Sequence, residues 1–413
     1  MGHAHTAQDW AFLLRVVHLS TSLQGGAGIA ARRLHSALLT AGIDSWLLAI
    51  SGFSESLIQE DELNQVVVVG RSPKARFASA ASMKANQFVS NGTGVLFTPF
   101  STHVDLTELI AHLRPTIIHG HNYFNFFDPF RLAALAPKSH IVLTLHDERL
   151  FTAGCHYSID CDGFTESCSP CRQSRPTMRS VIRLRERQMS LVQDALIIGP
   201  SEWIVSQASK SAVLRRHEVE LIRNAVPTNL FSPLTPSAQV PNRPQQPLRV
   251  LWHAGKDDTT ILRAIGSLMS GSALPGRGLQ VEHTGDSPLA AALSQSVGTI
   301  TTQTHMAQLL QKADVYLHSS VSDNSPNSIA EALCSGVPVF ASDTGGSMEL
   351  ISETGGGGGF ALGKHEQLEA LLKGALESHF WLGQIKRNAL RARPLVDPGT
   401  VAQQHIEAYE RHL

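Results

Sequence analysis

The chain has 413 residues, of which 42% are hydrophobic and 17% charged, and its formal net charge is -1. This length exceeds the roughly 250–300 residues at which a single hydrophobic core stops growing, so we expect two domains. The near-neutral charge argues against nucleic acid as the main ligand. No stretch approaches the ~18–20 apolar residues of a membrane span, and the N-terminus lacks the pattern of a secretory signal, so we expect a cytoplasmic protein.

The first half of the chain alternates candidate strands and helices. The apolar run 13–19 predicts a buried parallel strand, and a glycine-rich turn then leads into a helix that ends near Gly42. Further strands are predicted at 46–50, 66–69, 116–119, 141–145 and 195–198. This order of elements is typical of an α/β domain with a parallel sheet.

The same pattern restarts after a proline-rich segment. Prolines alternate with polar residues between Ser232 and Pro247, which predicts a semi-rigid linker. Strands are predicted at 248–252, 279–282, 315–318 and 337–341, helices at 259–270 and 328–333, and a flexible turn at 355–359. We therefore predict an α/β protein of two Rossmann-like, doubly wound domains, residues 1–240 and 241–397, that face each other across a cleft. A C-terminal helix at about 398–413 is a candidate to pack back on the first domain.

A glycine-rich loop, Gly25-Gly26-Ala27-Gly28, lies between the first predicted strand and the first predicted helix. Backbone N–H groups at a helix start favour an anion such as phosphate. A tight turn that merely needs glycine is an equally good interpretation, because the loop is not G-x-G-x-x-G. No acidic residue directly follows the strand at 46–50, which argues against a nicotinamide cofactor.

Histidines follow two of the predicted strands. His146 comes directly after the strand at 141–145, at the sheet edge where ligands of such domains bind. A lone histidine in a chain with 20 is more often structural, so both roles stay open. His119 and His121 could form a metal pair, but no carboxylate or third histidine stands at ligand spacing in the sequence. We therefore expect them to support the residues that contact the ligand and not to contact it themselves.

Two carboxylates, Asp323 and Glu331, are separated by seven residues. The first is expected in a loop after the strand at 315–318, and the second about two turns further, inside the next helix, so that both can address one ligand at the helix N-terminus. Asp, Asn and Ser also favour N-cap positions, which is the simpler interpretation of the loop. Glu331 argues against it, because a carboxylate between Ile329, Ala330, Ala332 and Leu333 needs a partner.

Four of the five cysteines crowd into one segment, at Cys155, Cys161, Cys168 and Cys171. In a reducing cytosol this clustering fits a structural zinc site better than disulfides. The spacing matches none of the common zinc motifs, and four reduced thiols packed in a loop are an equally good interpretation.

Taken in order, these features resemble retaining glycosyltransferases of family 4 over about Val16 to Leu362. The resembling segments are 18–20, 25–30, 144–147, 151–157, 200–203, 222–226, 313–332, 336–339 and 345–346. The run from Asp323 to Glu331 resembles the family's E-x7-E motif, with Asp323 in the place of the first glutamate. The segment 144–157 and its downstream cysteines resemble a branch that builds bacterial surface polysaccharides and exopolysaccharides.

The resemblance implies a GT-B fold, with an acceptor-side domain over 1–240 and a nucleotide-sugar donor domain over 241–397. It implies transfer of a hexose with retention of configuration, from a UDP- or GDP-sugar to a glycan or lipid-linked acceptor, with no metal needed for catalysis. Peripheral contact with the inner face of the membrane is compatible with such acceptors.

The family's site residues carry over to matching positions here. Glu331 would bind the ribose hydroxyls, Asp323 and the Asn324-Ser325 backbone the transferred sugar, and the Gly25-Gly26 loop the phosphates. His146 would contact the sugar from the opposite domain.

One segment departs from the family. Its members usually carry an arginine and a lysine after the first strand of the second domain, but residues 252–258 look shortened here, and Lys256 is the remaining cation. A non-catalytic donor-binding subunit therefore stays open as an alternative. A nucleotide-sugar epimerase is a second alternative, because it can share the same architecture.

Overall fold

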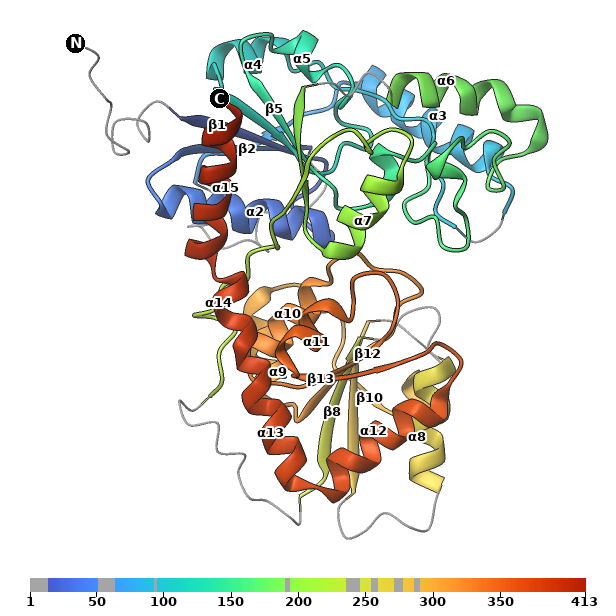
Figure 1. Ribbon diagram of the computed structural model, residues 1–413, viewed down its shortest axis with the longest axis vertical. Coiled ribbons are helices and arrows are strands. Elements are labelled where there is room, and N and C mark those ends of the chain that lie inside the picture. Colours follow the sequence, from blue (N-terminus) through green and yellow to red (C-terminus); the bar gives the residue numbers. More distant parts are fainter. Residues whose placement is uncertain are drawn as a thin grey trace. The chain divides into compact units, whose positions relative to one another are not determined.

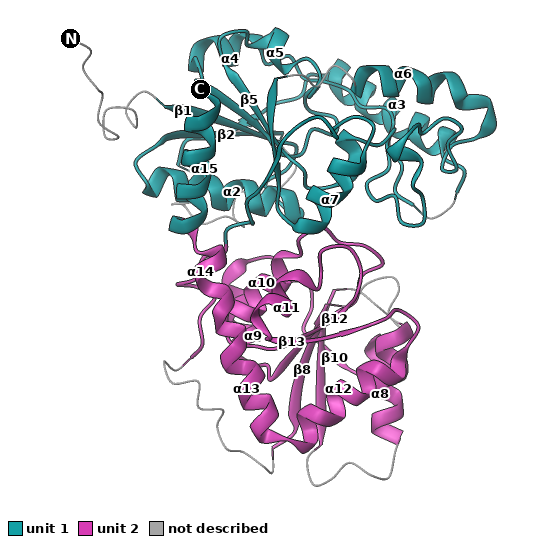
Figure 2. Cartoon of the chain, viewed as in Figure 1, with its two compact units in different colours: residues 1–225, 399–413 teal, residues 226–398 magenta. Residues whose placement is uncertain are grey.

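The computed structural model describes residues 14–50, 64–92, 95–189, 194–234, 246–253, 259–270, 278–285 and 290–413. The chain forms two compact units, shown in Figure 2: unit 1 ends at Ala225 and regains Gly399–Leu413, and unit 2 is Val226–Pro398. The boundary placed at residue 240 from the sequence falls in the segment 235–245, which lies outside the described residues.

Unit 1 is built on a seven-stranded sheet with the order β3-β2-β1-β4-β5-β6-β7, in which every pair is parallel. Its strands are β1 (Arg15–Ser20), β2 (Asp44–Ile50), β3 (Val66–Val69), β4 (Ile117–Gly120), β5 (His140–Thr144), β6 (Ala195–Gly199) and β7 (Val219–Leu221). Side chains in and just before β1 alternate between two hydrophobic clusters, Val17 and Leu19 in one and Leu14 and Val16 in the other. The sheet is therefore covered on both faces, which explains the nearly continuous apolar strands.

The helices of unit 1 lie around this sheet, and two of them, α3 (Pro73–Val89) and α6 (Arg179–Met189), lie at one end of the unit beyond the sheet (Figure 1). They are α2 (Gly25–Thr40), α3 (Pro73–Val89), α4 (Thr107–Leu113), α5 (Leu132–Leu135), α6 (Arg179–Met189), α7 (Glu202–Lys210) and the C-terminal α15 (Pro398–His412). Val401, Ala402, Ala408 and Tyr409 of α15 lie in the same cluster as Val16. The C-terminal end of the chain is thus part of the unit 1 core.

Unit 2 repeats the architecture with a six-stranded parallel sheet, ordered β10-β9-β8-β11-β12-β13. Its strands are β8 (Leu248–His253), β9 (Leu279–Thr284), β10 (Gln295–Ser296), β11 (Val315–His318), β12 (Val339–Ser342) and β13 (Gly357–Phe360). Its helices are α8 (Thr259–Ser270), α9 (Gln303–Lys312), α10 (Asn327–Cys334), α11 (Glu349–Thr354), α12 (His365–Glu377), α13 (His379–Ala389) and α14 (Arg393–Val396). Two parallel α/β units confirm the predicted fold class.

The glycine run at 355–359 is the main correction to the predicted elements. It is not a flexible turn, because Gly357–Phe360 forms β13 and pairs with β12 in parallel. A Cβ on Gly357 would lie 1.8 Å from the carbonyl oxygen of Val339, and one on Gly356 would lie 2.7 Å from the Cα of Ala389. These glycines are therefore needed for close packing of the backbone.

Candidate functional site

The predicted pair of carboxylates lies on the segment that joins β11 to α10 in unit 2. Asp323 is in the loop, with its side chain one third exposed, and Glu331 is buried on the helix. α10 begins at Asn327, so Glu331 lies in its second turn, inside the helix that follows the loop. The two carboxylates therefore lie on one short segment of chain, Asp323 in the loop and Glu331 on the helix.

Hydrogen bonds from the next strand fix this loop. The Ser342 hydroxyl accepts from the Ser320 N–H at 3.0 Å and donates to the Ser320 carbonyl oxygen at 2.9 Å. The Gly346 N–H donates to the Asp323 carbonyl oxygen at 2.8 Å. Gly345 has a φ of +57°, and a Cβ there would lie 2.0 Å from the same oxygen, so only glycine fits. The Gly345-Gly346 pair thereby positions Asp323.

Burial perturbs the ionisable groups around Asp323. It raises the pKa of Asp323 to about 6, although the N–H groups of Asn324 and Ser325 oppose the shift. Burial, with His253 nearby, lowers the pKa of His318 to about 4. The His318 Nε2 lies 3.9 Å from the Asp323 carboxylate, too far for a hydrogen bond.

Tyr316 is a member of this site that the sequence did not indicate. It is 1% exposed on β11, and burial raises the pKa of its phenol, with further upward contributions from Glu331 and then Asp323. Both carboxylates therefore lie near one buried phenol, whose hydroxyl has no hydrogen-bond partner among the described residues. A tyrosine inside the apolar strand 315–318 was the available signal, because a buried phenol needs a polar partner.

The glycine loop of unit 1 leaves a helix N-terminus accessible. α2 begins at Gly25, which has a φ of +73°, and Gly25 and Gly26 are both exposed. The N-cap Gln24 makes no side-chain capping bond, so its side chain does not occupy the N–H groups of the first turn. Gly28 is needed for packing, since its Cβ would lie 2.4 Å from the Ser22 carbonyl oxygen. Lys256, the expected cation of the second domain, lies outside the described residues.

His146 belongs to a buried histidine network in unit 1. Its Nε2 lies 3.1 Å from Nδ1 of His121, and Nε2 of His121 lies 3.0 Å from Nδ1 of His18. β1 and β4 are neighbours, and their register pairs His18 with His119. The expectation that no third histidine accompanies His119 and His121 is therefore wrong, because sequence spacing does not reveal residues on adjacent strands.

His18, His119 and His121 have ring nitrogens within 4.8 Å of one another, as a metal site requires. However, His119 already bonds the Tyr409 hydroxyl and the Thr144 hydroxyl, both at 2.7 Å. Its ring also stacks on His121 with centroids 4.2 Å apart, whereas rings that share a metal point their edges at it. These histidines fit a hydrogen-bonded network better than a metal site.

Asp147, next to His146, is held by a neighbouring arginine and histidine. Its carboxylate lies 2.8 Å from Nε of Arg149 and 3.3 Å from Nδ1 of His156. Burial alone would raise the pKa of Asp147, but Arg149 and His156 outweigh it and hold the pKa well below its usual range. This ion pair fixes the turn that follows His146.

The four clustered cysteines are neighbours in a loop of unit 1. Burial raises the pKa of Cys155, and the other three thiols raise it further. Burial also raises the pKa of Cys168 to about 12. Among the described residues, no three of these sulfurs lie within 4.8 Å of one another, so the thiols are close but not at the spacing of a bound zinc. The zinc site stays a prediction.

Comparison with known proteins identifies the segment that carries the acidic pair. The sequence model of the family described as "Glycosyl transferases group 1" matches residues 288–392, a range that contains β10 to β13 and α9 to α13. All of the matched residues lie in unit 2. The match contains Asp323, Glu331, Tyr316 and the Gly345-Gly346 turn.

One curated relative and several solved structures resemble the chain. The putative colanic acid biosynthesis glycosyl transferase WcaC of Escherichia coli is 23% identical over 241 residues, 53% of this chain and 56% of the relative, so the match spans about half of that protein. Sucrose-phosphate synthase of Thermosynechococcus elongatus has a TM-score of 0.67 at 15% identity, with 96% and 98% coverage. HepE of Anabaena, solved with UDP-glucose, has a TM-score of 0.64 at 16% identity, with 96% and 100% coverage. The predicted GT-B fold is thereby confirmed.

No helix in the described parts of the chain is long and apolar enough to cross a membrane.

Proposed function

We propose that this protein is a retaining glycosyltransferase that moves a hexose from a UDP- or GDP-sugar to a glycan or lipid-linked acceptor in polysaccharide biosynthesis. The observation that carries the proposal is the segment from Asp323 to Glu331, held beside Tyr316 within the group 1 domain. The relative WcaC is assigned to colanic acid biosynthesis, and HepE was solved with UDP-glucose, which supports a sugar nucleotide as donor.

The geometry of the segment suits a sugar nucleotide. Glu331 is a buried carboxylate on α10, and carboxylates form strong hydrogen bonds with vicinal hydroxyls such as those of ribose. Asp323 is partly exposed and is held by the Gly346 N–H, so it can contact a transferred sugar. In unit 1, the exposed N-terminus of α2 at Gly25 and Gly26 suits a diphosphate. His146 would contact the sugar.

A donor panel tests the proposal. The protein is incubated with UDP- and GDP-sugars, products are followed by mass spectrometry, and their configuration is read by ¹H NMR, with an Asp323→Asn Glu331→Gln variant as control. We expect hydrolysis or transfer of one donor, with the anomeric configuration of that donor kept. Tight donor binding without turnover would indicate a binding subunit, and inversion at C2 of the sugar would indicate an epimerase; either result overturns the proposal.

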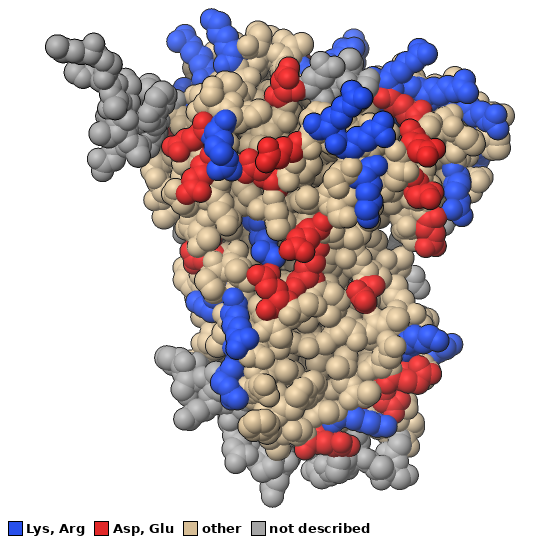
Figure 3. Space-filling view, in the orientation of Figure 1, with Lys and Arg blue, Asp and Glu red and all other residues tan. Residues whose placement is uncertain are grey.

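We further propose that unit 1 contacts an anionic membrane surface through α3 and α6. α3 buries Ser79, Ser82 and Asn86, whereas Phe77 and Phe88 on the same helix are 78% and 58% exposed. α3 carries three cations and no acidic residue, and α6 carries one glutamate and four arginines, of which Arg185 is buried. Lysine and arginine side chains lie over this end of unit 1 in Figure 3, with acidic side chains among them. Exposed aromatic rings among cations are typical of surfaces that bind anionic lipids.

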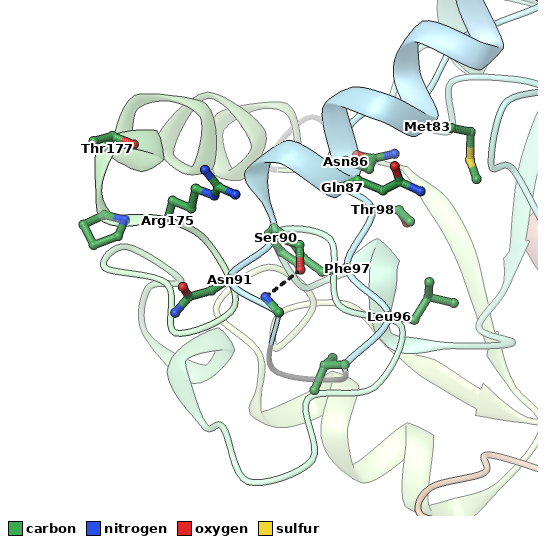
Figure 4. Close-up of a pocket in the computed structure, with 13 residues that line it drawn as sticks. Met83, Asn86, Gln87, Ser90, Asn91, Leu96, Phe97, Thr98, Arg175 and Thr177 are labelled. Atoms are coloured by element: carbon green, nitrogen blue, oxygen red, sulfur yellow. Dashed lines mark hydrogen bonds between the residues drawn. The ribbon is translucent and has the colours of Figure 1, made fainter. Parts of the chain in front are cut away.

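A pocket of about 890 Å³ lies beside α3 (Figure 4). Gln87 and Asn91 offer amides, Arg175 offers a cation, and Leu96 and Met83 offer exposed apolar surface. This mixture suits a molecule with a polar head and an apolar part, such as a lipid-linked acceptor. The pocket therefore agrees with an acceptor presented at a membrane.

Vesicle sedimentation tests the membrane proposal. We expect the protein to sediment with vesicles of phosphatidylcholine and phosphatidylglycerol, and not with phosphatidylcholine alone. Phe77→Ser Phe88→Ser should weaken sedimentation several-fold. Phe380→Ser is the matched control, because Phe380 on α13 of unit 2 is 79% exposed and lies outside α3 and α6; it should sediment like the parent. Equal sedimentation of both variants would contradict the role of α3.

A further inference from the structure

Three imidazoles in unit 1 form a continuous hydrogen-bonded chain from the buried sheet to a partly exposed residue. His18 and His121 are 0% and 6% exposed, and His146 is partly exposed. The two bonds use both nitrogens of His121, Nδ1 of His18 and Nε2 of His146. One ring nitrogen therefore remains at each end: Nε2 of His18 inside, and Nδ1 of His146 at the other end.

All three rings are neutral at pH 7. Burial lowers the pKa of His18 and His121 well below the ordinary value, and that of His146 to about 4. A neutral imidazole has one N–H donor and one bare nitrogen acceptor. In a chain of such rings, each bond fixes the direction of the next, because a ring that accepts at one nitrogen must donate from the other.

The chain can therefore run in only two directions. If it runs inward, His146 donates to His121, His121 donates to His18, and the His18 Nε2 carries a proton. If it runs outward, the His18 Nδ1–H donates to His121, the His121 Nδ1–H donates to Nε2 of His146, and the proton of His146 is on Nδ1.

The inner end decides between the two directions. The His18 Nε2 is buried and has no hydrogen-bond partner in the described structure. The inward direction would leave an N–H donor there without an acceptor, and orphaned buried N–H groups are rarer in proteins than unpaired acceptors. The outward direction leaves only a bare nitrogen at this point, so it is favoured.

We propose that His121 and His18 are positioning residues that hold His146 with its proton on Nδ1, so that His146 presents an N–H donor at its free end. Nδ1 of His146 makes no hydrogen bond to any described residue, so it is available to a ligand. A donor of this kind recognises a hydroxyl or ring oxygen of a sugar. This last step rests on the proposed glycosyltransferase function, whereas the tautomer itself does not.

The test reads the tautomer directly. Protein labelled with ¹⁵N-histidine is studied at pH 7.5 by two-bond ¹⁵N–¹H correlation spectra, with the His146 signals assigned from a His146→Ala sample. We expect the protonated nitrogen of His146 to be Nδ1, although free neutral histidine in water favours the proton on Nε2. No donor sugar is present, so this result stands or falls separately from the donor panel.

Variants then identify what fixes the tautomer. In His121→Gln, the glutamine amide lies near the position of the His121 Nε2 and cannot reach His146. His146 should therefore return to the Nε2–H form. His18→Leu removes the inner donor and should lower the Nδ1–H share of His146. His405→Gln is the matched control, because His405 is buried close to His119 but bonds only the Val401 carbonyl oxygen among the described residues; it should leave His146 unchanged.

Two results would overturn the proposal. One is a parent spectrum in which His146 is protonated on Nε2. This result contradicts the proposed tautomer even if the variants do not fold. The other is a folded His121→Gln variant in which His146 keeps its proton on Nδ1.

Discussion

Glu331 makes the sharpest prediction at the scale of single residues. It is 7% exposed on α10, so replacing it by alanine would leave bound ribose hydroxyls without their acceptor. Hydrogen bonds to a charged group contribute about 1.5–3 kcal/mol each, and two such bonds are not additive. We expect Glu331→Ala to weaken nucleoside diphosphate binding by about 2–4 kcal/mol, on the order of 30- to 1,000-fold, by calorimetric titration.

A nucleotide analogue provides the control for Glu331. A 2′,3′-dideoxy nucleoside diphosphate lacks the hydroxyls, so it should bind the parent and Glu331→Ala almost equally. If the variant has an intact melting curve and binds the natural nucleotide as tightly as the parent, the donor-site assignment is wrong.

His146 should affect turnover more than binding. The proposed contact to the sugar strengthens as charge develops at the anomeric carbon, so its loss lowers kcat and leaves nucleotide affinity nearly unchanged. We expect His146→Ala to lower kcat at least about 10-fold for the donor identified in the panel, since one such contact contributes upward of 1.4 kcal/mol. An unchanged kcat would indicate a structural role.

Asp323 predicts a specific pH dependence of stability. Its pKa is about 6 in the folded protein, above the ordinary value, so the folded state holds the proton to a higher pH than the unfolded chain does. Stability contributed by this group is therefore present at low pH and is lost as pH rises towards 6. Asp323→Asn should melt like the parent near pH 4 and several degrees higher at pH 8.

The expected size of the Asp323 effect is modest. Because the side chain is one third exposed, solvent screens the carboxylate, and we expect about 1 kcal/mol at pH 8. Melting curves at pH 4, 6 and 8 measure it. A difference that is the same at all three pH values would show that charge is not its cause.

At the scale of elements, β13 depends on glycines that no other residue can replace. A Cβ on Gly357 would meet the Val339 carbonyl oxygen, so Gly357→Ala must part β12 from β13. We expect this substitution to lower the free energy of unfolding of unit 2 by about 1–3 kcal/mol, which corresponds to a drop of several degrees in its melting temperature.

Gly266 is the matched control for β13. It lies on α8 in the same unit, and its Cβ would meet only the Leu293 side chain at an ordinary 3.6 Å. Gly266→Ala should therefore leave stability unchanged or raise it by up to about 1 kcal/mol, because alanine favours helix over glycine. Equal effects of the two substitutions would contradict the packing argument.

The cysteine loop is also an element whose role can be measured. We predict one structural zinc held by Cys155, Cys161, Cys168 and Cys171, which requires the four sulfurs to draw together to about 3.8 Å from one another. Elemental analysis of chelator-washed protein should then find one equivalent of zinc. Less than about a tenth of an equivalent, with four titratable thiols, would leave the cluster as packed reduced cysteines.

At the scale of the whole molecule, each unit has its own core, and the C-terminal helix belongs to the first. The Tyr409 hydroxyl bonds Nδ1 of His119 at 2.7 Å, and both groups are fully buried. Tyr409→Phe would leave His119 without this partner, at a cost of about 1–3 kcal/mol. By scanning calorimetry, we expect the unit 1 transition to fall and the unit 2 transition to stay in place.

The sequence by itself determined the two α/β units and most of their strands. Buried parallel strands are short, continuous apolar runs, so their positions can be recognised locally, and the ranges 66–69 and 315–318 coincide with β3 and β11. It also indicated the segment from Asp323 to Glu331, because both acids lie on one short stretch of chain. Its prediction for residues 355–359 was wrong, since a glycine run looks the same in a turn and in a closely packed strand.

Only the tertiary structure decided which residues surround those positions. Tyr316 joins the acidic pair, and His18 joins His121 and His146, because a parallel sheet brings the ends of β1, β4 and β5 together across more than 100 residues of chain. The sequence also suggested that the C-terminal helix packs back on the first domain, but not which residues it contacts: the bond between Tyr409 and His119 spans 290 residues. Such contacts depend on strand order and register, which no local pattern in the sequence encodes.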